Sequence, residues 1–108
     1  MWILQSATPP HDSFTFRLTP GATKTVGRAP RADFIMDAPL VSRIHCRLTA
    51  TDANVEVVDL KSTNGTFVND KRVEKATLSV GDRLRVGRVE LTINVASGSP
   101  MANGATSD

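Results

Sequence analysis

The sequence contains little cysteine and few aromatic residues. Its 108 residues include one cysteine, one tryptophan, four phenylalanines and no tyrosine. The single Cys46 excludes an intrachain disulfide and indicates a reducing intracellular compartment, the cytoplasm, or the nucleus if the source is a eukaryote. Cys46, its neighbour His45 and the distant His11 are too few ligands for a metal site. We therefore expect a buried core thiol, and neither a metal nor another cofactor.

Long apolar runs and clusters of basic residues are also missing. No segment approaches the roughly 18 apolar residues of a membrane span, and the apolar start Met1–Leu4 lacks the features of a signal peptide. We therefore expect no membrane partner. The 13 lysines and arginines give a net charge of +2 and are spread along the chain, which suits one locally bound anion better than a nucleic acid. The scarcity of aromatic rings likewise disfavours a surface that stacks bases.

The length of the chain fits one domain, because domains typically run to about 100–150 residues. From Ser97 onward the sequence is rich in serine, glycine, proline, asparagine and alanine and has no periodicity, as is typical of flexible linkers. We therefore expect a folded domain over residues 1–96 and a flexible linker or tail over residues 97–108. Such a module is expected to be monomeric in isolation and part of a larger protein.

The hydrophobic pattern predicts strands and no helices. Helical spacing of apolar residues is nowhere sustained, whereas alternation of apolar and polar residues recurs in short segments bounded by turn residues. In one segment Phe14, Phe16 and Leu18 alternate with Thr15 and Arg17, which predicts a strand with one buried face. The predicted strands are residues 2–5, 14–18, 23–26, 34–36, 46–50, 55–60, 67–68, 72–73, 84–86 and 89–95.

Turn residues between these segments predict hairpins. Asp52–Asn54 and Asn69–Lys71 have turn chemistry, and Gly87–Arg88 fits a type II′ turn. Asn64–Gly65 is the strongest hairpin-turn dipeptide, so we expect a turn there as well. About ten short strands without helices predict a sandwich or a closed barrel, because an open sheet of that width would leave a face exposed. We favour the sandwich, whose loops gather at its ends.

A hydrolase triad is one interpretation of the polar residues in these loops. Ser42 and His45 lie three residues apart, and Asp59 follows downstream. However, no G-x-S-x-G nucleophile elbow surrounds Ser42, and a serine and a histidine so close in one short loop rarely align for proton transfer. We therefore expect that the chain is not an enzyme and has no catalytic residues.

Hydrogen-bond donors in the loops favour the binding of an anion. Arg28, Ser42, Arg43, Thr63 and Asn64 supply guanidinium, hydroxyl and amide donors, and no acidic residue is among them. A phosphate monoester carries about −1.5 to −2 charges and three strong acceptor oxygens, so a cluster of donors binds it well. Donors without a base, a metal or a nucleophile predict binding rather than turnover.

The ordered set of loop motifs resembles the forkhead-associated (FHA) domain family. The motifs are Gly27-Arg28, Ser42-Arg43-x-His45, Thr63-Asn64-Gly65-Thr66, Asn69, Gly81-Asp82 and Gly87, and the resemblance covers roughly residues 2–95. It implies an all-β fold, a sandwich of two twisted, mainly antiparallel sheets with about eleven strands and with binding loops at one end. It also implies a phosphothreonine-dependent interaction module that binds a phosphorylated segment of a partner protein in signalling.

The resemblance also implies roles for single residues in phosphothreonine binding. Arg28 and Ser42 contact the phosphate, with Thr63 alongside, and Arg43 adds phosphate or backbone contacts. Asn64 bonds the main chain of the bound peptide, and the γ-methyl of the phosphothreonine lies in a small pocket near the loop that bears Asn64.

Three further positions are structural in the family. His45 supports the loop that bears Ser42, while Gly27 and Gly65 permit the turns. The peptide residue three beyond the phosphothreonine is expected near Leu40-Val41 and Gly87-Arg88, without a predicted preference.

The alternative is a small β-barrel that binds nucleic acid through a basic surface. Affinity would then fall steeply with salt, with a logarithmic slope near −0.9 for each neutralised phosphate of duplex DNA. A site for a single phosphate is far less sensitive to salt.

Overall fold

Strands account for the regular structure in the computed structural model, which describes residues 1–6 and 14–96. No helix occurs in these residues, so none of them forms a helix that could cross a membrane. The all-β prediction is confirmed. The strands are β1 (Trp2–Ser6), β2 (Thr15–Leu18), β3 (Thr23–Gly27), β4 (Phe34–Ile35), β5 (Cys46–Ala50), β6 (Val55–Asp59), β7 (Thr66–Val68), β8 (Lys71–Val73), β9 (Lys75–Leu78), β10 (Arg83–Val86) and β11 (Val89–Val95).

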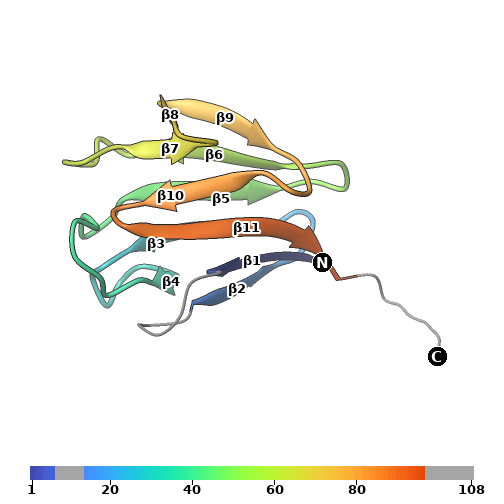
Figure 1. The fold of residues 1–108 in the computed structure, drawn as a ribbon. Coiled ribbons are helices and arrows are strands. Elements are labelled where there is room, and N and C mark those ends of the chain that lie inside the picture. The colour runs from blue at the N-terminus through green and yellow to red at the C-terminus, as the bar shows by residue number, and fades with distance from the viewer. Residues whose placement is uncertain (7–13, 97–108) are drawn as a thin grey trace.

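The strands form two separate sheets that face each other (Figure 1). A six-stranded sheet has the order β2-β1-β11-β10-β7-β8, and a five-stranded sheet has the order β4-β3-β5-β6-β9. Neighbouring strands are antiparallel except β3 and β4, which are parallel. Each sheet ends in edge strands and neither closes on itself, so the molecule is a β-sandwich. The closed barrel of the alternative interpretation is wrong.

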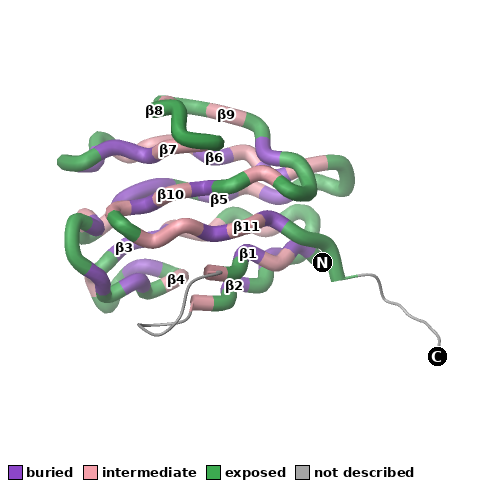
Figure 2. Tube along the Cα trace, viewed as in Figure 1, coloured by how far each residue is buried: buried purple, intermediate pink, exposed green. Residues whose placement is uncertain are grey.

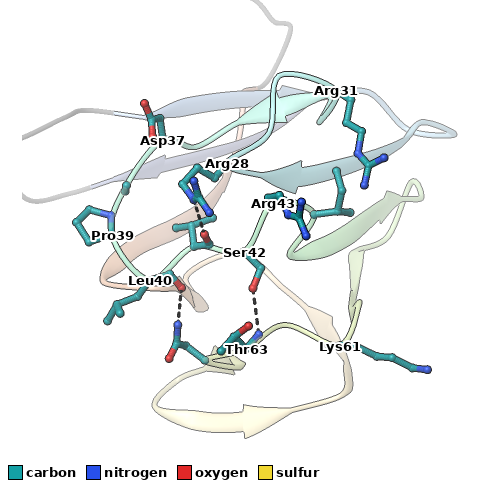
Figure 3. A pocket seen from close by; sticks show the side chains of 13 residues that line it. Arg28, Arg31, Asp37, Pro39, Leu40, Ser42, Arg43, Lys61 and Thr63 are labelled. Atoms are coloured by element: carbon teal, nitrogen blue, oxygen red, sulfur yellow. Dashed lines mark hydrogen bonds between the residues drawn. The ribbon is translucent and has the colours of Figure 1, made fainter.

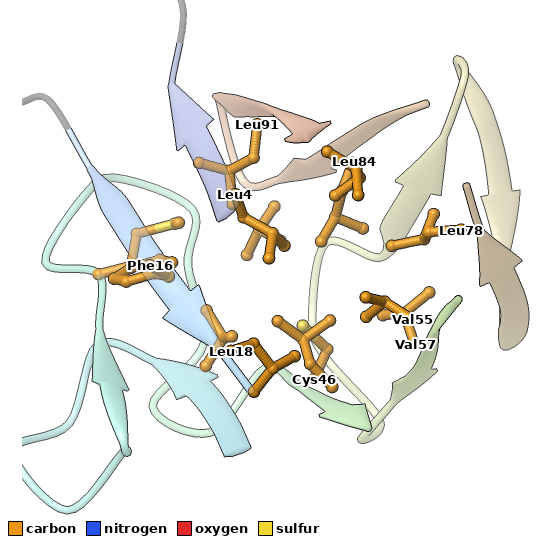
Figure 4. Close-up of a cluster of buried hydrophobic side chains, with 14 of the residues drawn as sticks. Leu4, Phe16, Leu18, Cys46, Val55, Val57, Leu78, Leu84 and Leu91 are labelled. Carbon is orange, nitrogen blue, oxygen red and sulfur yellow. The ribbon is translucent and has the colours of Figure 1, made fainter. Parts of the chain in front are cut away.

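The core lies between the two sheets, because inward and outward side chains alternate along the strands (Figure 2). Cys46 is fully buried in it, as predicted for a core thiol. Figure 4 shows how the side chains of both sheets meet in this layer. Other fully buried members on the strands are Leu4, Leu18, Leu84, Val86, Leu91 and Ile93 from the six-stranded sheet and Val26, Leu48, Val55, Val57 and Leu78 from the five-stranded sheet.

Aromatic side chains join the two sheets at the side of the sandwich formed by β1, β2 and β4. The ring of Phe16 on β2 stacks on Phe34 of β4 with 4.6 Å between the ring centroids. The indole Nε1 of Trp2 donates a hydrogen bond of 2.9 Å to the carbonyl oxygen of Thr51, in the β5–β6 turn. Phe16, Phe34 and Trp2 therefore serve the fold.

Most of the predicted hairpins are present. The turn between β10 and β11 pairs Val86 with Val89, and Gly87 has a φ of 62°. The β7–β8 turn pairs Val68 with Lys71, and both of its central residues have positive φ, 50° at Asn69 and 69° at Asp70. This φ pattern is that of a type I′ turn, which asparagine and aspartate tolerate better than other non-glycine residues.

The prediction of a hairpin turn at Asn64–Gly65 is wrong. The strands that flank this dipeptide, β6 and β7, belong to different sheets, so the segment crosses between the sheets instead of reversing within one. Gly65 has a φ of 91°, which explains the glycine without a hairpin. The tail predicted over residues 97–108 lies outside the described residues.

The connections after β3, β4, β6 and β10 lie at one end of the sandwich (Figure 1). Antiparallel pairing produces this arrangement, because the end of β3 lies beside the start of β5 and the end of β10 beside the start of β7. Met1 and Ala96 lie at the opposite end, where the amide of Ala96 donates to the carbonyl oxygen of Met1. The loop end is therefore remote from the ends of the described chain.

Candidate anion-binding site

The loops at this end surround an open groove of about 810 Å³, here called the loop groove (Figure 3). All five residues that were predicted to bind phosphothreonine or its peptide line it: Arg28, Ser42, Arg43, Thr63 and Asn64. Of these, Ser42 is half-buried and the other four are exposed. The fold thus brings together side chains from the segments after β3, β4 and β6.

Close backbone packing at Gly27 places Arg28 beside Ser42. The amide of Arg28 donates to the carbonyl oxygen of Ser42 at 2.9 Å, and the amide of Ala29 donates to that of Arg43 at 3.0 Å. A Cβ at Gly27 would collide with the carbonyl group of Arg43, so only glycine permits this approach. The Arg28 Nε donates to the carbonyl oxygen of Val41 at 3.1 Å, which orients the guanidinium group.

His45 links the two loops that carry the remaining donors. It is fully buried, its Nδ1 accepts a 3.0 Å hydrogen bond from the amide of Ser42, and its Nε2 lies 2.8 Å from the carbonyl oxygen of Gly65. Because Nδ1 accepts, the ring proton is on Nε2 and is donated to Gly65. Both ring nitrogens are therefore occupied by main-chain groups, and neither serves the Ser42 hydroxyl as a base.

Ser42 and Asn64 make further hydrogen bonds between the loops. The hydroxyl oxygen of Ser42 accepts a 3.0 Å bond from the amide of Thr63, and Asn64 Nδ2 donates to the carbonyl oxygen of Leu40 at 3.1 Å. Within the described part of the chain, no hydrogen bond uses the Ser42 hydroxyl proton, the Thr63 hydroxyl or the terminal guanidinium nitrogens of Arg28. These groups are free to donate to an anion in the groove.

Asp59 organises the segment that carries Thr63 and Asn64. Its carboxylate accepts hydrogen bonds from the hydroxyls of Ser62 at 2.5 Å and Thr66 at 2.7 Å. Burial tends to raise the pKa of the Asp59 carboxyl, but the hydrogen bonds from Ser62 and Thr66 outweigh burial and hold this pKa below its ordinary value. The contribution of these bonds to stability is therefore present at neutral pH and is lost as pH falls through the lowered pKa.

The positions of the cysteine, histidine and acidic side chains bear on nucleophilic catalysis and metal binding. Burial and the nearby charge of Asp59 raise the pKa of the Cys46 thiol to about 12, so the thiol is protonated at neutral pH. Among residues 1–6 and 14–96 there is no group of three or more histidine, cysteine, aspartate or glutamate side chains suited to a metal ion. The Ser42, His45 and Asp59 side chains make separate hydrogen bonds and do not form a triad.

Two positive side chains of the groove were not predicted from the sequence. Arg31 and Lys61 line it together with Arg28 and Arg43, whereas Asp37 is the only acidic residue among its lining side chains. In the sequence, a lone arginine or lysine in a loop cannot be distinguished from an ordinary solvent-exposed charge. Its contribution becomes visible only when the loops are brought together.

Gly87 supports the segment of the groove that precedes Ser42. A Cβ at this position would lie 2.8 Å from the carbonyl oxygen of Pro39 and 2.9 Å from a methyl group of Val41. Leu40, between these two residues, has a φ of 69°, a costly conformation for a branched side chain. The β10–β11 turn therefore holds the backbone around Leu40.

Gly87→Ala is expected to lower the melting temperature more than Gly21→Ala. Both glycines have positive φ, 62° and 91°, so both substitutions cost about 1–2 kcal/mol for a left-handed alanine. Only alanine at Gly87 meets backbone atoms, which adds about 1–3 kcal/mol of steric strain. Nothing lies within 4 Å of a Cβ at Gly21. Thermal unfolding checks the order, and equal shifts would contradict the support assigned to Gly87.

Comparison with known proteins places this β-sandwich and its groove in a family. The FHA domain family model matches residues 24–87. The chain is 42% identical over 77 residues to the ABC transporter ATP-binding/permease protein Rv1747 of Mycobacterium tuberculosis, covering 71% of this chain and 9% of that protein. It is 41% identical over 69 residues to the oxoglutarate dehydrogenase inhibitor of Corynebacterium diphtheriae, covering 64% of this chain and 48% of that protein. The chain thus spans less than half the length of these relatives.

Solved structures give the same result. The FhaA FHA domain in complex with the intracellular domain of Rv3910 matches with a TM-score of 0.76 and 31% identity, over 87% of this chain and 100% of that one. A structure from an analysis of phosphothreonine-dependent FHA domain interactions matches with a TM-score of 0.77 and 30% identity, over 88% of this chain and 96% of that one. The fold and the groove define the class of the molecule, a β-sandwich binding domain. The chain belongs to the FHA domain family.

Proposed function

We propose that this chain is a phosphothreonine-dependent protein interaction module that binds a phosphorylated segment of a partner protein in signalling. One observation carries the proposal. The free hydroxyl and guanidinium donors of Arg28, Ser42 and Thr63 converge on an open groove that contains a single acidic side chain, Asp37. A phosphate group matches these donors in charge and in its number of acceptor oxygens. Similarity to FHA domains solved with a partner or studied for phosphothreonine dependence supports it further.

Each residue has a role in this proposal. Arg28 and Ser42 bind the phosphate, Thr63 donates alongside, and Arg43 adds charge. Asn64 bonds the main chain of the peptide with its carbonyl oxygen and its second amide hydrogen, because the first already donates to Leu40. The supporting residues hold these groups in place, His45 through its two hydrogen bonds and Gly27 and Gly65 through their backbones.

In this proposal the site binds the phosphopeptide and catalyses no reaction. The site contains donors but no activated nucleophile, since His45 is occupied by main-chain groups. We propose that residues 1–96 form this module as a monomer within a larger intracellular protein, and that residues 97–108 are a linker or tail outside the module. The kinase that phosphorylates the partner would then decide when binding occurs.

Nucleic acid is a weaker candidate for the ligand. Two basic residues near the middle of the six-stranded sheet are paired with acids: Arg83 with Asp70 and Glu90, and Arg85 with Asp70. Arg85 also covers the ring of Phe67 at 4.4 Å from its centroid. These contacts occupy two of the cations and one of the few aromatic rings that a nucleic-acid surface would use.

Calorimetric titration of the chain with peptides from an oriented phosphothreonine library tests the proposal. We expect the best peptide to bind with a dissociation constant in the micromolar range, about −8 kcal/mol. The same peptide with unmodified threonine should show no saturable binding, because a neutral hydroxyl does not replace the phosphate among the donors. Equal affinities for the two peptides would end the proposal.

Phosphothreonine is expected to bind at least about tenfold more tightly than phosphoserine in the same peptide. The two residues present the same phosphate, so any preference comes from the γ-methyl group. A methyl group held in a fitted pocket changes affinity by roughly 10–200-fold, and we place this methyl against the loop that bears Asn64. Titration of two otherwise identical peptides measures the ratio. Equal affinities would leave a general phosphate site.

A further inference from the structure

Charge is distributed unevenly around the loop groove. Figure 3 shows Arg31, Arg43 and Lys61 on one side of Ser42, and Asp37, Pro39 and Leu40 on the other. We call the first set the cationic arm and the second set the opposite arm. The phosphate donors Arg28, Ser42 and Thr63 lie between the two arms, so a peptide bound through its phosphothreonine would meet a different charge in each direction.

The backbone of the cationic arm is fixed around Arg31. The amide of Ala32 donates to the carbonyl oxygen of Ala29 at 3.0 Å, and Ala32 is buried. The carboxylate of Asp33 accepts hydrogen bonds from the amide of Thr25 at 2.9 Å and from its hydroxyl at 3.1 Å. These contacts hold the β3–β4 turn against β3 on both sides of Arg31, so the arginine projects from a defined position.

Lys61 is fixed in a similar way. The amide of Leu60 donates to the carbonyl oxygen of His45 at 3.0 Å, and the amide of Ser62 donates to the Asp59 carboxylate at 3.2 Å. Lys61 itself has a φ of 57°, which is uncommon for a residue other than glycine, asparagine or aspartate. Its neighbours therefore force an unfavourable backbone conformation at a residue that lines the groove, and such conformations concentrate at functional sites.

None of these three cations has an acidic partner among the described residues. Ion pairs in the described parts of the sheets involve Lys75, Arg83 and Arg85 instead. Three positive side chains on one side of a groove repel one another, and a bound anion removes that repulsion. The primary phosphate has its own donors in Arg28, Ser42 and Thr63, with added charge from Arg43 at the inner end of the arm, so Arg31 and Lys61 supply charge beyond what that phosphate needs.

From this geometry, and resting on the proposed function, we propose that the cationic arm binds a second anionic group of the same phosphopeptide. This group is a carboxylate or a second phosphate next to the phosphothreonine. The opposite arm offers no such site, because the Asp37 carboxylate repels an anion there. The chain would therefore select segments with acidic residues on one side of the phosphothreonine and neutral, apolar or basic residues on the other side.

Four versions of the best library peptide test this selection. One carries two glutamates before the phosphothreonine, one carries two glutamates after it, one has glutamines at all four positions, and one repeats the glutamine version with unmodified threonine. We expect only one of the two glutamate peptides to bind at least about threefold more tightly than the phosphorylated glutamine peptide, on the scale of surface ion pairs. The other should bind no more tightly. Equal gains for both peptides, or no gain for either, would overturn the proposal.

The variant Arg31→Gln/Lys61→Gln tests whether the cationic arm causes the preference for one glutamate peptide. It should lose the preference for the favoured glutamate peptide and still require phosphothreonine. The control Arg17→Gln/Lys71→Gln makes the same change in net charge away from the groove and should keep the preference. If both variants lose it equally, the effect is one of net charge and the proposal is wrong. If no phosphorylated peptide binds the parent chain, the proposed function itself fails.

A fifth peptide distinguishes the two sources of the anion. It carries a second phosphothreonine in place of the glutamates on the favoured side. A phosphate carries about −1.5 to −2 charges, so we expect it to bind more tightly than the glutamate version. Arg31→Gln/Lys61→Gln should remove the advantage of both anions. An advantage that persists in this variant would overturn the assignment to the cationic arm.

Discussion

Replacing Arg28 with alanine is expected to weaken phosphothreonine-peptide binding by about 30- to 5,000-fold. Removing one partner of a charge-assisted contact costs about 2–5 kcal/mol, and each 1.4 kcal/mol is a factor of about ten. The fold should persist, because Arg28 is exposed and its side chain makes one hydrogen bond, to the carbonyl oxygen of Val41. Calorimetry measures the affinity, and thermal unfolding shows that the variant is folded.

Arg17→Ala is the matched control for this change. Arg17 is exposed on β2 and is not among the residues that line the groove, so its loss should leave the affinity unchanged. Arg28→Lys separates charge from geometry, because lysine keeps the charge but lacks the planar fork of the guanidinium group. We expect intermediate affinity for this variant. Affinity within about threefold of the parent for Arg28→Ala would show that the phosphate binds elsewhere.

His45→Ala is expected to lower both stability and affinity. The substitution leaves the amide of the half-buried Ser42 and the carbonyl oxygen of the buried Gly65 without their partner. Each unsatisfied buried group costs about 1–3 kcal/mol. For a domain of this size, 1 kcal/mol corresponds to about 4–8 °C in melting temperature, so we expect a decrease on the order of 10 °C or more.

The decrease in affinity should follow from the loss of contact between the two loops. His45 holds Ser42 and Gly65 at a fixed separation, and Thr63 and Asn64 precede Gly65 directly. Peptide titration should therefore be made at a temperature where circular dichroism shows the variant folded. A variant that melts within about 2 °C of the parent and binds normally would contradict the bridging role of His45.

The sequence predicted the strands well because their signals are local. Period-two alternation and turn residues identify β2, β5 and β11 without knowledge of their partners. The edge strand β9 was not predicted, because its alternation covers only four residues and one of its two inward side chains is the small Ala76. Asn64–Gly65 was misassigned because its turn chemistry is compatible with a hairpin and with a crossing between sheets. Only the pairing of β6 and β7 with other strands decides between them.

The groove was predictable in part for a similar reason. Arg28, Ser42 and Thr63 belong to motifs with recognisable neighbours, and the structure places them around one groove. Arg31 and Lys61 have no such neighbours and could not be distinguished from ordinary surface charges. Their place in the groove depends on the tertiary contacts of Asp33 and Asp59. Candidate site residues that belong to a motif could therefore be predicted from the sequence, and those that reach the groove only through the fold of the loops could not.

The most direct test of the proposed site is a titration of ¹⁵N-labelled chain with the best phosphothreonine peptide, followed by NMR of the backbone amides. We predict that the largest shifts fall on Arg28, Ser42, Arg43, Thr63 and Asn64. Only small shifts are expected on β2 and β8, the edge strands of the six-stranded sheet, because they carry none of the residues that line the groove. The unphosphorylated peptide should cause none of these changes. Shifts concentrated on Arg72, Arg83 and Arg85, or shifts independent of phosphorylation, would contradict the account.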